Sequence, residues 1–197
     1  MLETDKEMRR LQKAHVTLMR NPVFAFYAGI MMIGKCEIDD DVPTACTNGR
    51  DVKYGRKFIK ELNDKELAFL VLHENGHKLY RHLTVWRKLY EENAQLANMA
   101  CDYRINLLLY DMDRMEKKIA FPRLPNGERI GCFDERFRGM SIPEIFRILM
   151  QEKEEGGGGG GGGGGSGSGD EQMDEHQWGK ASERTKEQEE ALAKEID

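Results

Sequence analysis

The sequence predicts an α+β fold made mostly of helices, with one small antiparallel β-sheet beside a buried helix. Residues recur at helical spacing over much of the chain. A first helix is expected over residues 4–20, with one face formed by Met8, Leu11, His15, Leu18 and Met19. Residues 36–57 do not show helical spacing. They combine β-branched residues with Asn48-Gly49, a frequent turn between antiparallel strands. We therefore expect strands at residues 44–47 and 51–54.

The remaining helices are predicted from their start signals. Asn63 and Glu66 fit a capping box, and the apolar run 67–72 that follows indicates a buried helix. Ser141 as the cap and Pro143 in the first turn predict the last helix of the compact part. Two further helices are expected over residues 23–33 and 93–110, with a loop over 120–135.

Composition divides the chain into three parts. Residues 1–150 are predicted to form one compact domain, residues 151–169 a flexible Gly/Ser-rich linker, and residues 170–197 an acidic, partly helical segment. Residues 151–197 hold five Lys/Arg and thirteen Asp/Glu, a net charge of −8, whereas the whole chain carries −5. The compact part is therefore near +3, which disfavours a nucleic-acid-binding protein.

The chain is expected to be cytoplasmic, with reduced thiols and no membrane partner. No secretory signal follows Met1, and none of the four cysteines forms a Cys-x-x-Cys pair. Thiols stay reduced in the cytoplasm. The most apolar early run, residues 23–33, is too short to cross a bilayer.

A metal-binding pattern lies in the predicted buried helix. His73-Glu74-Asn75-Gly76-His77 fits His-Glu-x-x-His. Residues four apart on a helix differ by about 40° in direction, so both imidazoles can reach one metal ion. Glu74 would then lie near enough to take a proton from bound water. The alternative is a pair of histidines held by hydrogen bonds on a helix face, without a metal.

A catalytic zinc ion usually has three protein ligands, so a third side chain is needed. His82 lies about 140° around the helix from His77 and is expected to face elsewhere. Asp102 is the preferred candidate, because it is a carboxylate in an apolar turn of the next predicted helix. Asn98 and Asn106 lie four residues on either side of Asp102 and could orient it. A surface or capping role is the alternative for Asp102.

Three ordered stretches, at residues 42–49, 68–82 and 100–106, resemble a known family. It is the zincin-like metallopeptidase domain family found N-terminal to von Willebrand A-like domains, in the stand-alone version of bacteriophage genomes. The resemblance covers about residues 7–150. It implies a zincin-like fold, a Zn²⁺ ion held by His73, His77 and Asp102, Glu74 as the base, and, for a bacteriophage protein, the host cytoplasm. Here a Gly/Ser linker and an acidic segment follow instead of the second domain.

The expected function is zinc-dependent hydrolysis of peptide bonds in a protein or peptide substrate. Tyr80 and Tyr103 are candidate oxyanion donors. His176 in the acidic segment is a candidate accessory ligand or oxyanion donor, with a solvated or merely packed histidine as its alternative. The hairpin at Asn48-Gly49 is a candidate for binding an extended peptide. The alternative function is a catalytically silent, zinc-bound protein-interaction module regulated by its acidic tail.

Overall fold

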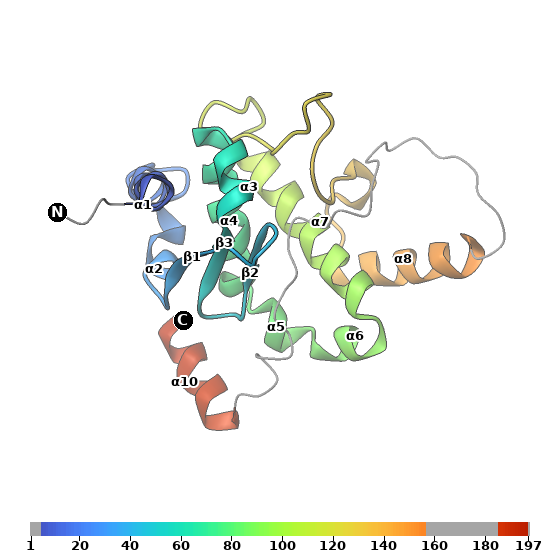
Figure 1. The fold of residues 1–197 in the computed structure, drawn as a ribbon. Helices are drawn as coiled ribbons and strands as arrows, with labels where there is room; N and C mark the ends of the chain where they lie inside the picture. Colours follow the sequence, from blue (N-terminus) through green and yellow to red (C-terminus); the bar gives the residue numbers. More distant parts are fainter. Residues whose placement is uncertain (1–4, 157–184, 197) are drawn as a thin grey trace.

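The fold is α+β, as predicted, with helices packed around one small three-stranded sheet (Figure 1). The computed structural model describes residues 5–156 and 185–196. The helices are α1 (Lys6–Met19), α2 (Ala28–Met31), α3 (Arg56–Glu61), α4 (Asp64–Leu79), α5 (His82–Val85), α6 (Arg87–Glu92), α7 (Ala94–Met112), α8 (Ile142–Gly156) and α10 (Lys186–Ile196), with short 3₁₀ turns η1 (Ala25–Tyr27) and η2 (Glu135–Phe137). None of these described helices is long and apolar enough to cross a membrane.

Helix α4 is the central element, and its predicted capping box is confirmed. The Asn63 side chain accepts hydrogen bonds from the backbone amides of Lys65 and Glu66, and the Glu66 carboxylate accepts one from the Asn63 amide at 2.9 Å. All residues from 67 to 78 are buried, because α1, α2, α7 and β2 pack around this helix. The apolar run that follows the cap therefore forms the middle of the main core.

The sheet is mixed, so the prediction of a purely antiparallel sheet is wrong for one strand. Strands β2 (Ala45–Thr47) and β3 (Val52–Gly55) form the predicted antiparallel hairpin around Asn48-Gly49. Strand β1 (Cys36–Asp39) adds parallel to the other side of β3, giving the order β1-β3-β2. Residues 42–44 cross over the end of β3, where a Cβ atom on Gly55 would lie 2.2 Å from the Val42 carbonyl oxygen. A glycine is therefore required at this crossing.

The prediction of one continuous helix over residues 23–33 is also wrong. The chain instead forms η1 and then the single turn of α2. The buried residues Phe24, Tyr27, Ile30 and Met31 keep helix-like spacing across both elements, so this spacing did not reveal the break between them.

Helices α7 and α8 form a second apolar cluster with η2. Asn93 caps α7, and the amide and hydroxyl of Ser141 both donate to Glu144 at the start of α8. The shared cluster includes Ala97, Ala100, Cys101, Phe137, Ile145 and Phe146. Helix α8 continues to Gly156, past residue 150, and α10 lies in the predicted acidic segment. The rest of the predicted linker and His176 lie outside the described residues.

We expect Asn63→Ala to destabilise the protein by about 1 kcal/mol, because an N-cap side chain of this kind contributes roughly 0.5–2 kcal/mol. Denaturant unfolding followed by circular dichroism measures the change. Glu61→Ala, at an exposed position just before the cap, is the matched control and should stay within about 0.5 kcal/mol of wild type. Equal stabilities of the two variants would show that the cap does not stabilise α4.

Candidate metal centre

The structure brings together the three side chains predicted as metal ligands. Helix α4 supplies His73 and His77, and α7 supplies Asp102. The Nε2 atoms of the two histidines are 3.2 Å apart, and Asp102 Oδ1 lies 3.2 Å from Nε2 of His77 and 3.7 Å from Nε2 of His73. All three side chains are at most 1% exposed. Three donor atoms from two helices thus face one another in the interior.

Close packing of α7 on α4 explains how Asp102 reaches the two histidines. A Cβ atom built on Gly76 would lie 3.2 Å from Cδ1 of Ile105, tighter than most real contacts. Ile105 is three residues after Asp102, and neighbouring helix positions of this spacing lie on one face. The glycine inside the His-Glu-x-x-His pattern therefore lets the face of α7 that carries Asp102 approach α4.

The donor set fits a tetrahedral metal ion. In a tetrahedral site with bonds of about 2.0–2.1 Å, two ligand atoms lie roughly 3.3 Å apart. The three observed separations, 3.2, 3.2 and 3.7 Å, are close to that value. Two imidazole nitrogens and one carboxylate oxygen also form a donor set that zinc binds in catalytic sites, with a fourth position left for water or substrate.

Asn106 holds His73, and not Asp102 as predicted from spacing. Its Oδ1 accepts a hydrogen bond from Nδ1 of His73 at 2.8 Å, and its Nδ2 donates to the Cys132 carbonyl at 2.9 Å. An amide oxygen can only accept, so the proton of His73 lies on Nδ1 and Nε2 is left to bind a metal. Asn98, the other predicted neighbour, is buried on α7.

The prediction that His82 faces away from the site is wrong. Its Nδ1 lies 3.2 Å from Nδ1 of His77, and the two rings meet edge to face. The expected separation of about 140° assumed that one helix continues from His77 to His82. Instead, α4 ends at Leu79, and Arg81 adopts a left-handed conformation with φ 51° and ψ 39°. This reversal of the chain returns His82 to the site. Sequence spacing alone gave no sign of it.

Glu74 is fully buried on α4, next to His73 in the chain and three residues before His77, the two candidate histidine ligands. The ammonium group of Lys78, also buried, donates to the carbonyls of Ile30 and Ile33 and to Oδ1 of Asn75. Burial lowers the pKa of Lys78 to about 8, and the nearby Glu74 carboxylate acts in the opposite direction. The surroundings of Glu74 therefore combine low solvation with a neighbouring basic group.

The two candidate oxyanion tyrosines occupy different surroundings. Tyr103 packs its ring 4.7 Å from that of Phe137 in the α7–α8 cluster, and burial raises the pKa of its hydroxyl. Tyr80 is 39% exposed and stacks on His82, with ring centroids 5.7 Å apart. Tyr80 thus stacks on His82, which lies next to the candidate ligand His77.

The fold is α+β, and its buried His-His-Asp cluster is a group of side chains that could hold a metal ion. The chain belongs to the family described as "Putative metallopeptidase domain", whose model matches residues 6–196. The match includes α10, beyond the part that the sequence resemblance covered. Comparisons with curated proteins and with solved structures found no match. The zincin-like character implied by the resemblance stays a prediction.

We expect Asn106→Ala to weaken metal binding roughly 10–100-fold, the usual effect of losing a hydrogen bond to a ligand. Asn106→Asp should retain most of the affinity, because its carboxylate still accepts from Nδ1 of His73. Competition with a chromophoric chelator measures both. Asn126→Ala, at an exposed position in a loop, is the control. Equal affinities of Asn106→Ala and wild type would show that Asn106 does not orient His73.

Proposed function

We propose that this protein is a zinc-dependent metallopeptidase, in which His73, His77 and Asp102 hold Zn²⁺ and Glu74 is the general base. The observation that carries the proposal is the triangle of donor atoms on α4 and α7, with separations of 3.2–3.7 Å. Membership of the metallopeptidase family supports it. A buried carboxylate between two ligands has a clear use in hydrolysis and is costly to retain otherwise.

The proposed chemistry assigns separate tasks to the residues. Bound zinc would supply Lewis-acid polarisation of the scissile carbonyl and of the attacking water. Glu74 takes a proton from that water and delivers it to the leaving amine. Asn106 keeps the proton of His73 on Nδ1, so that its Nε2 stays available as a ligand.

The sheet offers a place for an extended peptide. In the order β1-β3-β2, strand β2 is at an edge of the described sheet, and it packs against α4. An extended substrate can add to such an edge through backbone hydrogen bonds. All three residues of β2 are buried, so the proposed substrate, a protein or peptide segment in extended form, would reach this edge only after a covering element moves.

One observation favours the second candidate function, a catalytically silent zinc-bound interaction module. The three ligands and Glu74 are at most 1% exposed, and structural zinc sites are typically closed, whereas catalytic ones keep an open position. Structural sites, however, usually have four protein ligands and no need of a base. Peptide hydrolysis would require a neighbouring element to move and admit the substrate.

We expect Glu74→Gln to bind zinc with wild-type affinity and to lose about 10²–10⁴-fold in peptide hydrolysis. Gln matches Glu in size but cannot take a proton from water at neutral pH, and general-base catalysis contributes a factor of this size. A proteomic cleavage screen of both zinc-loaded proteins measures the difference. Glu61→Gln, at an exposed position, controls for the substitution itself.

Identical cleavage patterns for zinc-loaded wild type and Glu74→Gln, over a broad peptide library, would contradict the enzyme. The interaction module would then be the better account of the site.

A further inference from the structure

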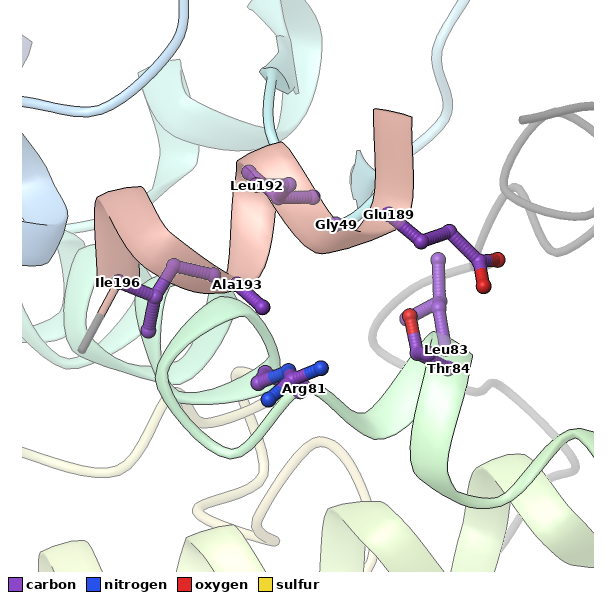
Figure 2. A pocket seen from close by; sticks show the side chains of 8 residues that line it. All are labelled: Gly49, Arg81, Leu83, Thr84, Glu189, Leu192, Ala193 and Ile196. Atoms are coloured by element: carbon purple, nitrogen blue, oxygen red, sulfur yellow. The ribbon is translucent and has the colours of Figure 1, made fainter. Parts of the chain in front are cut away.

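The C-terminal helix α10 packs against the segment that follows α4. Figure 2 shows α10 lying over Arg81, Leu83 and Thr84, and over Gly49 in the turn between β2 and β3. Leu192 of α10 is 9% exposed and lines the same small pocket, together with Ala193 and Ile196. An apolar face of α10 is therefore in contact with the domain, although residues 157–185 separate it from α8 in the sequence.

Two ion pairs fix the direction of α10. Glu189, near its start, pairs with Arg87 of α6, and Glu195, near its end, pairs with Arg50 of the β2–β3 turn. These groups are partly exposed, so each pair contributes little stability and is weakened by salt. Docking of α10 is thus specific in orientation and depends mainly on the apolar contact of Leu192.

The residues under α10 flank His82 on both sides. Arg81 has the left-handed conformation that returns His82 to His77, and Leu83 is 2% exposed. A non-glycine residue in this conformation is strained and persists only where its surroundings hold it. Helix α10 is part of those surroundings, because Arg81, Leu83 and Thr84 all line the pocket that it closes.

If His77 is a metal ligand, the positions of the protons in the hydrogen bond between His82 and His77 are determined. When Nε2 of His77 binds the metal, its Nδ1 carries the proton and donates to Nδ1 of His82, 3.2 Å away. His82 must then be neutral, with its own proton on Nε2. This bond would fix the ring of His77 as Asn106 fixes the ring of His73.

We propose that His82 is a positioning residue for the metal ligand His77, and that docked α10 holds His82 in place. The inference rests on the proposed metal site and adds its regulation. Release of α10 would free the Arg81–Thr84 turn, withdraw the hydrogen bond from His77 and weaken metal binding. The C-terminal helix would thus set the metal affinity of a site on α4 and α7.

The test compares full-length variants that differ in the docking of α10. Leu192→Asp places a charge in the buried contact, whereas Ala191→Asp places the same charge on the exposed side of the same helix. We expect Leu192→Asp to bind zinc about 10-fold more weakly than wild type, within the range for lost ligand-orienting partners, and Ala191→Asp to bind normally. Chelator competition measures the affinities, and circular dichroism checks that both metal-free proteins are folded.

A double-variant cycle with His82 tests whether α10 acts on metal binding through His82. His82→Ala should weaken binding by a similar factor and shift the visible spectrum of the cobalt-substituted protein as Leu192→Asp does. His82→Gln, whose side-chain oxygen can accept from Nδ1 of His77, should restore part of the affinity. In the His82→Ala background, Leu192→Asp should cause no further loss.

Wild-type affinity in either Leu192→Asp or His82→Ala would overturn the inference. So would a full additional loss in the double variant, because α10 would then act by another route. Failure of wild type to bind zinc at all would overturn the proposed function together with this inference. A failure of peptide hydrolysis alone, with normal zinc binding, would contradict only the proposed function.

Discussion

The close approach of α7 to α4 at Gly76 is the contact on which the candidate metal centre depends. Two histidines one turn apart on α4 can reach a common metal ion through helix geometry alone. The third candidate donor, Asp102, comes from another helix and depends on how the two helices pack. Ile105 fills the space beside Gly76, and this packing places Asp102 within 3.2 Å of His77. A Cβ atom at residue 76 would lie 3.2 Å from Cδ1 of Ile105, so the Ile105 side chain would have to shift by a few tenths of an ångström.

Burial of so many polar groups in one helix must be offset by specific contacts. An unsatisfied buried polar group costs about 1–3 kcal/mol, and α4 buries His73, Glu74, Asn75, His77 and Lys78. The ammonium group of Lys78 has three oxygen acceptors, and Asn75 also donates to the Val71 carbonyl. A metal ion would supply the common partner of the histidines. The same contacts would hold the site rigid in the proposed reaction.

The sequence predicted the parts of the fold that depend on local signals. The capping box of α4 and the hairpin at Asn48-Gly49 were confirmed, because each depends on short-range spacing along a helix or turn. The structure also brings His73, His77 and Asp102 together, although Asp102 lies on a different helix. The parallel pairing of β1 depends on a chain crossing at Gly55, which no local pattern shows. The position of His82 depends on one left-handed residue, Arg81, and helical geometry could not anticipate it.

Calorimetric titration of zinc into the metal-free protein tests the central claim most directly, since it measures stoichiometry and affinity together. We predict one zinc ion per chain for wild type and a large loss of affinity for Asp102→Ala, because the variant keeps both histidines but lacks the donor from α7. Binding by Asp102→Ala with the affinity and stoichiometry of wild type would contradict the assignment. It would show that the packing of α7 on α4 does not complete the metal site.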